Sequence, residues 1–398
     1  MKSKNVLPYP ITPAKKDDHL MDVAKITSDT YANGQHLEEI SKVYFANCHY
    51  DWDTSRLAFD GDDLIHHWGV WGFPMRLGAA QVKVAGVGAV VTRKAYRKQG
   101  LMQKAALASF EAMRESGYDL SILRGRHYAK FGYARAWNYV TYRLNAEEIP
   151  KFTIKQSYEV LGPQHMNQII ALYNREYADF SSTVLRPTYR MLEVGDMGAY
   201  GWFSKEKLIG YVRAEPSEDK KSLQCLEATG DAEQGLAVLG ELFRKGNYET
   251  LAFFTLPKPH PMLQIIRRGA CIVEDKYFYH SGWQVKIINL YSLIEKLTPA
   301  LQARLEKSHL ASWTGALALD AGDQQVTLSI TAGKLNITSE SAEYKLIGGA
   351  ALGRLLIGSD ESNEIFQQEN ITCTKEVLEL ANTLFPNLHP VMSHWDEY

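Results

Sequence analysis

The stretch Val87–Met102, VGAVVTRKAYRKQGLM, joins an apolar run to a basic run and then to a glycine. Its apolar start predicts a buried strand, and Gly100 opens a run that predicts a helix ending near Gly117. The first N–H groups of a helix have no partners within it, and the helix dipole favours an anion there. Glycine lets the backbone approach an anion closely, and Arg97 and Lys98 add positive charge. The stretch therefore predicts a phosphate site between a strand and a helix.

The basic run Arg93–Lys98 has two other interpretations, a solvated surface segment or a nucleic-acid contact. The formal net charge of the chain is −2, so no broad positive field supports a nucleic-acid partner, and we expect none. A chain of 398 residues, 45% hydrophobic and 23% charged, has the composition of a globular protein with two or three domains.

Periodicity around this stretch predicts alternating strands and helices. A strand over 80–92, a helix over 100–116 and a strand over 120–123 follow one another, and a similar order recurs over residues 223–256. This recurrence suggests an internal duplication, although no identity of residues supports it. A hairpin is expected over 326–337, turning at Ala332-Gly333.

Cysteine spacing and hydropathy bound the environment. The four cysteines lie far apart without a CxxC pair, which argues against a zinc site and a disulfide framework. The N-terminal segment lacks the apolar centre of a signal peptide, and no apolar run reaches the roughly 20 residues of a membrane helix. We therefore expect a cytoplasmic protein with no metal and no membrane partner.

A second motif lies downstream, where Tyr128-x-x-x-Gly132-Tyr133 follows a predicted strand. Together with Arg97-x-x-Gly100, it resembles the pyrophosphate loop and the Y-x-x-x-G-F element of the GNAT superfamily of N-acetyltransferases. Met102 departs from the Gly or Ala of many members, and Lys94 replaces a common proline.

The overall layout and the ending LFP…HWDEY, residues 384–398, are similar to the enhanced intracellular survival acetyltransferase family. This resemblance implies a mixed α/β fold of tandem GNAT-type domains followed by a C-terminal sterol carrier protein-like α+β domain. The expected boundaries are 1–150 for the catalytic domain, 151–283 for a degenerate second GNAT-like domain and 284–398 for the last domain. Relatives in this family form rings, so a homo-oligomer is also implied.

The resemblance implies acetyl-CoA as cosubstrate. Backbone groups of the strand would pair with the pantetheine arm, one N–H there would stabilise an oxyanion, and the loop would hold the pyrophosphate. The implied cosubstrate-binding residues are Val90, Val91, Thr92, Arg97, Lys98, Gln99, Gly100, Leu101, Met102 and Gln103. In the second copy, Thr229–Gly235 carries acidic residues where phosphate needs cations, and Ile265 stands where Tyr128 stands in the first. We expect no cosubstrate there.

Tyr128 is the implied general acid for the departing coenzyme A thiolate. An ordinary tyrosine pKa near 10 faces a thiol pKa near 8.5, so the proton transfer is only mildly uphill. The alternative role is packing, because YxxFGY also fits an aromatic corner of a core.

The terminal carboxylate of Tyr398 is the implied base toward the acceptor amine. An unperturbed C-terminus titrates near 3.5 and an alkylammonium near 10.4, a mismatch of roughly 7 pKa units or 9 kcal/mol. Orientation of the amine is therefore expected to contribute more than proton abstraction.

The leading functional hypothesis is direct acetyl transfer to a primary amine on a small cationic molecule, such as an aminoglycoside-like or polyamine compound. Two alternatives stay open: acetylation of protein lysines, and a non-catalytic sensor that binds coenzyme A or a lipid. Asp51-Trp52-Asp53 could line a pocket for a cationic amine or form a solvated acidic turn.

Overall fold

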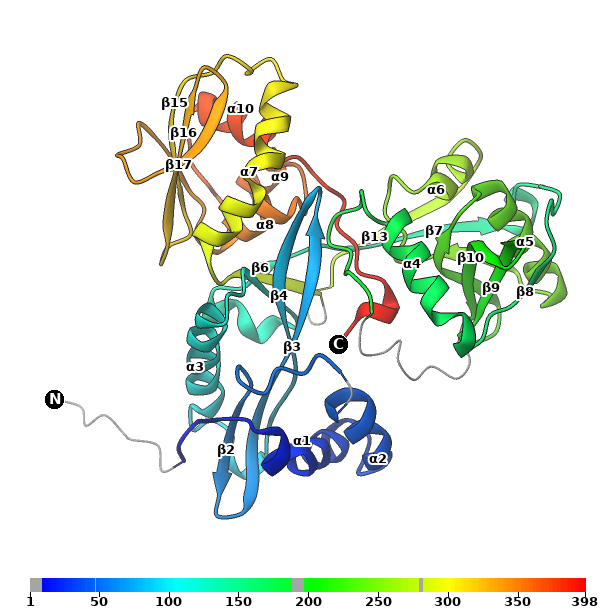
Figure 1. Cartoon of the computed structure of the whole chain (residues 1–398), viewed down its shortest axis with the longest axis horizontal. Coiled ribbons are helices and arrows are strands. Elements are labelled where there is room, and N and C mark those ends of the chain that lie inside the picture. Colours follow the sequence, from blue (N-terminus) through cyan, green and yellow to red (C-terminus); the bar gives the residue numbers. More distant parts are fainter. Residues whose placement is uncertain (1–8, 47, 188–196, 279–281) are drawn as a thin grey trace.

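The computed structural model describes residues 9–46, 48–187, 197–278 and 282–398. Three lobes meet around the C-terminal tail, which runs between the first two and ends near the centre of the molecule (Figure 1). Each lobe is built on its own sheet, with helices packed against it. This is the mixed α/β architecture of tandem GNAT-like units and a further sheet domain, which confirms the predicted fold class; the likeness to sterol carrier proteins stays a prediction.

The first sheet has seven strands, with the long hairpin β3–β4 at its centre. Helices α1 (Lys16–Tyr31), α2 (Leu37–Ile40) and α3 (Leu101–Glu115) accompany it. In spatial order its strands are β1 (Thr12–Pro13), β2 (Arg56–Asp60), β3 (Asp63–Leu77), β4 (Ala80–Thr92), β5 (Leu120–Arg124), β14 (Trp283–Ile287) and β6 (Ala134–Arg135).

The second sheet repeats this pattern, with the antiparallel pair β10–β11 at its centre and β11 followed by a helix and a strand parallel to it. Its helices are α4 (Met166–Glu176), α5 (Ala232–Lys245) and α6 (Pro261–Ile266). In spatial order its strands are β13 (Ile272–Lys276), β7 (Tyr139–Asn145), β12 (Thr250–Phe253), β11 (Ser222–Thr229), β10 (Lys207–Pro216), β9 (Ala199–Ser204) and β8 (Tyr158–Val160).

In the chain, the strands of the second sheet lie between strands of the first. β7 precedes the expected boundary at residue 150 yet pairs with β12 and β13 of the second sheet. β14 follows all the strands of the second sheet in the chain, yet it pairs with β5 and β6 of the first sheet. Because β14 returns to the first sheet after β7–β13 have formed the second, the second unit is inserted within the first.

The third unit shares its core with the first. Its sheet has the order β17 (Lys334–Thr338), β16 (Gln325–Thr331), β15 (Gly315–Asp320) and β18 (Tyr344–Ile347), accompanied by α7 (Leu290–Glu306), α8 (Leu352–Ile357), α9 (Ser362–Gln368) and α10 (Lys375–Leu384).

Helix α7 links these two units. The Asn289 side chain caps it by accepting from the Ser292 N–H at 3.1 Å. Leu293, Leu297 and Leu301, spaced at helical intervals, are completely or almost completely buried, and each contributes about 1.5–3 kcal/mol. They share one apolar cluster with the far half of the β3–β4 hairpin.

Candidate active site

The centre of the first sheet opens into a groove between β4 and β5. These two strands pair in parallel from Val84–Leu120 to Gly86–Ile122. Both continue beyond that point without pairing with each other. β4 stays paired with β3 on its other side up to Thr92, so the opening widens toward the start of α3. Backbone groups on the inner edges of both strands therefore face the groove.

A bulge shapes the β4 side of this groove. Ala89 has a left-handed backbone (φ 47°), and the pairing register with β3 shifts beside it. The His67 Nδ1–H donates to the Ala89 carbonyl at 2.8 Å, so Nε2 of the neutral ring accepts from the Tyr50 hydroxyl at 2.7 Å. Burial lowers the pKa of His67 to about 3, which keeps the ring neutral and the bulge fixed.

The start of α3 is uncapped at the place where the sequence predicts an anion site. Gly100 precedes the helix in a left-handed conformation (φ 85°), and no side chain caps it. The predicted loop residues from Arg97 to Gly100 are exposed, whereas Leu101 is buried and anchors the first turn. The Arg97 Nε–H donates to the Thr92 carbonyl at 3.1 Å, which folds the side chain back over the strand end. The loop therefore presents backbone N–H groups and two cations to solvent.

Two of the carbonyls predicted to meet the pantetheine arm already accept hydrogen bonds. Tyr31 donates to the Val90 carbonyl at 3.3 Å, and Arg97 donates to that of Thr92. Tyr31 is 63% exposed, so it can turn aside when a ligand enters. Val91 is buried, while Val90 and Thr92 are half-buried.

Tyr128 lies on the short turn after β5, within Arg126–Phe131. Its ring packs edge-on against Trp68, with centroids 5.9 Å apart, and against Tyr133 at 6.2 Å. Burial raises the pKa of Tyr128 to about 12, and nearby Tyr31 adds to the effect. In the ligand-free protein its proton is thus held more tightly than an ordinary tyrosine would hold it.

Tyr398 fills the narrow end of the groove, where β4 and β5 part. Its hydroxyl donates to the Ile122 carbonyl at 2.6 Å, at the point where β5 leaves β4. The ring lies 5.7 Å from Phe73 and 6.3 Å from Trp71, centroid to centroid. Gly86 makes room for it, because a Cβ there would stand 2.6 Å from the ring. The two predicted catalytic residues thus occupy different clusters: Tyr128 packs with Val90, and Tyr398 with Ala89.

A cavity of about 470 Å³ adjoins Tyr398, large enough for a small molecule. Five aromatic side chains form much of its wall, and the other lining residues come from α1, α2, the turn between them and the bulge of β4. Glu39 contributes a side-chain carboxylate to the lining. Its Oε2 lies 3.3 Å from the His36 Nδ1, and both side chains are exposed. The lining residues are Thr27, Tyr31, Ala32, His36, Glu39, Ile40, Tyr44, Phe45, Trp71, Ala89 and Tyr398.

The acidic run before β2 does not line this cavity. Asp51 instead accepts from the Tyr118 hydroxyl at 2.5 Å and from the backbone N–H groups of Asp53 and Thr54. Sequence reasoning missed the aromatic walls at Tyr31, Tyr44 and Phe45, because an aromatic residue at helix spacing is typical of a core. The adjacent histidines His66 and His67 are held by hydrogen bonds within the protein, His66 to the Thr92 hydroxyl and His67 to the Tyr50 hydroxyl.

Comparison with known proteins agrees with this geometry. Residues 13–136 match the family described as acetyltransferase (GNAT) domain. No curated protein matches the chain. Among solved structures it is similar to a probable N-acyltransferase from Enterococcus faecalis, with a TM-score of 0.76 and 14% identity over 97% of this chain and 98% of that one.

Two further solved structures have the same fold. A GCN5-related N-acetyltransferase from Kribbella flavida gives a TM-score of 0.73 with 16% identity over 98% of each chain. Eis1 from Mycobacterium abscessus gives 0.68 with 14% identity over 96% of this chain and 99% of that one. At these identities the structures establish the fold alone.

Residues 13–136 therefore form a GNAT acetyltransferase domain, and the chain is an acyltransferase enzyme. GNAT domains use acetyl-CoA as their cosubstrate. Among the described residues, no helix is long and apolar enough to cross a membrane. Within the same residues, no group of three or more His, Cys, Asp or Glu side chains is arranged to hold a metal.

Proposed function

We propose that this enzyme transfers acetyl from acetyl-CoA directly to a primary amine of a small cationic molecule. One observation carries the proposal: an uncapped helix start follows the segment of β4 that parts from β5, and an aromatic cavity adjoins the same segment at Ala89. The first suits a diphosphate and the second suits an acceptor, so the reacting atoms would meet in the groove between them.

The residues that would hold the cosubstrate are those of the loop and first turn of α3. Backbone N–H groups of Leu101, Met102 and Gln103 belong to this open turn, and a diphosphate there gains the helix dipole. Arg97, Lys98 and Gln99 flank it. The edge of β4 over Val90, Val91 and Thr92 would pair with the pantetheine arm, with an N–H of this edge turned toward the thioester oxygen.

Tyr128 would return a proton to the departing thiolate. With a pKa of about 12 against a thiol near 8.5, that transfer is uphill by roughly 3.5 pKa units or ~5 kcal/mol in the ligand-free protein. A thiolate desolvated in the same groove becomes more basic, which narrows the gap. Tyr128 therefore delivers its proton late, as the carbon–sulfur bond breaks after the carbon–nitrogen bond has formed.

Tyr398 would orient the acceptor amine through its carboxylate. The aromatic walls of the cavity favour a cation by facing it with ring electrons, and Glu39 adds a negative charge. The amine must lose one proton before it attacks, and the pKa mismatch with a carboxylate sends that proton to water. This arrangement resembles that of the enhanced intracellular survival acetyltransferases. By the same resemblance, the proposal includes three domains, a homo-oligomeric assembly and a cytoplasmic location.

The test is acetyl transfer measured by thiol release and by mass of the product. The acceptor panel contains a polyamine, an aminoglycoside and a lysine peptide. We expect turnover of one of the first two; transfer to the lysine peptide alone would redirect the proposal to protein acetylation. Thiol release no faster than buffer hydrolysis with every amine would overturn it.

The Tyr128→Phe variant tests the acid. We expect kcat to fall about 100-fold or more while the Kd of coenzyme A changes less than about two-fold, because general acids contribute 10²–10⁴-fold. Tyr133→Phe is the matched control: this neighbour is buried in the same cluster and bonds Ser121 at 2.6 Å. Equal kcat values for Tyr128→Phe and the parent enzyme would assign Tyr128 to packing.

A further inference from the structure

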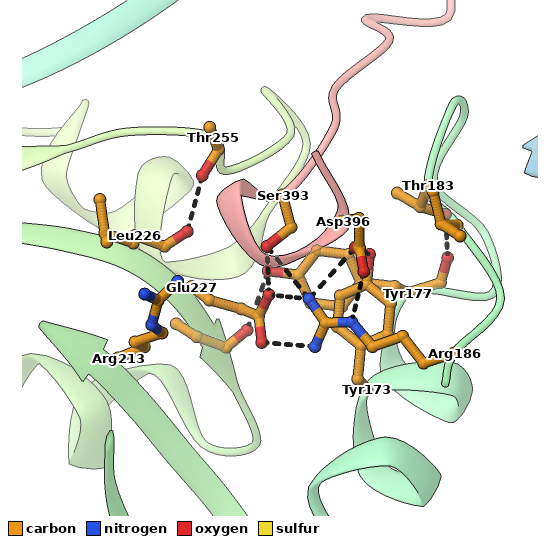
Figure 2. Close-up of polar contacts among 12 residues, drawn as sticks. Tyr173, Tyr177, Thr183, Arg186, Arg213, Leu226, Glu227, Thr255, Ser393 and Asp396 are labelled. Atoms are coloured by element: carbon orange, nitrogen blue, oxygen red, sulfur yellow. Dashed lines mark hydrogen bonds and ion pairs between the residues drawn. The ribbon is translucent and has the colours of Figure 1, made fainter. Parts of the chain in front are cut away.

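The second GNAT-like unit contains a buried ion cluster that binds the C-terminal tail. Glu227 lies on β11, two residues beyond the last parallel pair with β12, Cys225–Phe253. This is the same kind of place that Tyr398 occupies in the first unit, where β4 and β5 part. In the second unit, residues of the tail occupy it (Figure 2).

Arg186 connects Glu227 to the tail. Its Nη1 donates to Glu227 at 2.8 Å, and its Nε donates to the Asp396 carboxylate at 3.0 Å. The Ser393 hydroxyl donates to the other oxygen of Glu227 at 2.5 Å. The side chains of Arg186, Glu227 and Asp396 are at most 1% exposed, so water does not weaken these bonds. We call these four residues the tail clamp.

Aromatic residues of the second unit complete the clamp. Tyr211 donates to Glu227 at 2.5 Å, and Tyr173 donates to Asp396 at 3.2 Å. The Arg186 guanidinium lies 3.4 Å from the centre of the Tyr173 ring. Burial alone would raise the pKa of Glu227, but the Arg186 charge outweighs it and holds that pKa below its usual range. Every charge in the clamp is thus compensated by partners that surround it.

The tail passes from the clamp into the first unit within two residues. Trp395 packs into the cluster around α4, next to Arg213 at 4.3 Å. Glu397 then forms an ion pair with Arg124 at the end of β5, and Tyr398 bonds the Ile122 carbonyl. An extended residue spans about 3.3–3.6 Å, so a slip of one residue at the clamp would move Tyr398 by that distance.

We propose that Arg186, Glu227, Ser393 and Asp396 are positioning residues for acetyl transfer, and that the groove of the second unit serves as the receptor for the chain's own tail. This inference rests on the proposed function, because it assigns the second unit the task of holding Tyr398 at the acceptor cavity. Misplacement of a reacting group by 1 Å can cost about 100-fold in rate, so such a fixed anchor has a catalytic purpose.

The first experiment measures release of the tail without turnover. Carboxypeptidase is added to the ligand-free protein, and loss of Tyr398 is followed by mass spectrometry. In Glu227→Gln we expect trimming at least about ten-fold faster than in the parent, with the Kd of coenzyme A changed less than about two-fold. The control is Asp360→Asn, which disturbs a comparable buried pair with Arg354 that does not bind residues 393–398.

Kinetics then connects release to catalysis. We expect Glu227→Gln to lower kcat about ten-fold or more with little change in the KM of acetyl-CoA, while Asp360→Asn leaves both near parental values. Faster trimming without loss of kcat would overturn the positioning role. Unchanged trimming would overturn the clamp itself, whether or not the enzyme acetylates any amine tested.

A pair of glycine insertions avoids variants that fail to fold. A glycine after His389 lies upstream of the clamp, beside a cavity of about 300 Å³ that can take the extra residue. A glycine after Asp396 lies between the clamp and Tyr398. We expect the upstream insertion to keep kcat within about three-fold and the downstream insertion to lower it about 100-fold. Equal losses from both insertions would show that the clamp does not set the register.

Discussion

The two GNAT-like units differ most clearly where their main helices begin. α3 starts at Gly100 without a side-chain cap and follows a basic loop, so its first N–H groups stay open to a ligand. α5 starts at Asp231, whose carboxylate accepts from the Gln234 N–H at 2.7 Å. A capping carboxylate both occupies the helix start and repels phosphate. The same fold therefore leaves the helix start open in one copy and caps it in the other.

The grooves of the two units differ in a corresponding way. The first opens beside a cavity of about 470 Å³ that contains Tyr398, whereas the second holds the clamp residues of the tail. In the second unit Ile265 takes the place expected for a tyrosine, and it packs against the core. Under the two proposals above, the duplicated fold divides its work: one copy would bind substrates and the other would hold a segment of the chain in place.

The sharpest way to break this comparison is to give α3 the cap of α5. In Gly100→Asp we expect the Kd of coenzyme A to rise about 100-fold, because a carboxylate would occupy the helix start and meet the diphosphate's charge. Isothermal titration calorimetry measures it. The control is Gly100→Asn, which tolerates the left-handed backbone and carries no charge, and it should lose markedly less. Equal affinity in the Asp variant and the parent would place the diphosphate elsewhere.

A smaller effect is expected from adding one methyl group beside Tyr398. In Gly86→Ala the new Cβ would stand 2.6 Å from the Tyr398 ring, so the Tyr398 side chain must leave the narrow end of the groove. We expect kcat to fall about ten-fold with the affinity for coenzyme A retained. Gly240→Ala in α5 is the second-unit control, since its Cβ meets ordinary contacts at 3.6 Å or more. A Gly86→Ala enzyme with parental kcat would separate Tyr398 from catalysis.

Acid pH should destabilise both units gradually. Burial lowers the pKa of His66 and of His260 to about 4 and that of His67 to about 3. Each folded pKa lies below the unfolded value, so the stability is present above pH 6.5 and is lost as pH falls toward 4. We expect a loss of about 1.4 kcal/mol per pH unit for each histidine.

Urea denaturation at pH 7, 6 and 5 measures this slope. His260→Asn should reduce the slope by about a third, and its control is His36→Asn, which removes an exposed histidine at the rim of the cavity. An unfolding free energy that is constant from pH 7 to pH 5 would contradict the expectation.

Much of the local structure could be predicted because it is locally encoded. The strand over 80–92 has the predicted bounds, and caps and apolar spacing likewise mark the helices over 232–245 and 375–384. Thr374, for example, caps the last of these by accepting from the Val377 N–H at 3.4 Å. The open helix start at Gly100 was predicted for the same reason.

Pairing between distant segments could not be predicted. Nothing near Tyr139–Asn145 or Trp283–Ile287 indicates which sheet each strand joins, because both sheets offer similar apolar edges. Arg186 and Glu227 carry no sequence signal either: a charged residue in a loop or strand is usually solvated, and only the fold shows that these two are buried against the tail. The role given to Tyr398 depended on resemblance, and the structure places its ring at the groove.

The return of the chain to the first sheet at β14 imposes an order on biosynthesis. β5 needs β14 as its neighbour, and β6 pairs with β14 as well, yet residues 283–287 are made after the whole second unit. At about 5–20 residues per second, the nascent first unit waits on the order of ten seconds with the edge of β5 uncovered. An uncovered apolar edge is a template for aggregation, so ribosome-associated chaperones should matter for the yield of this enzyme more than its stability once folded would suggest.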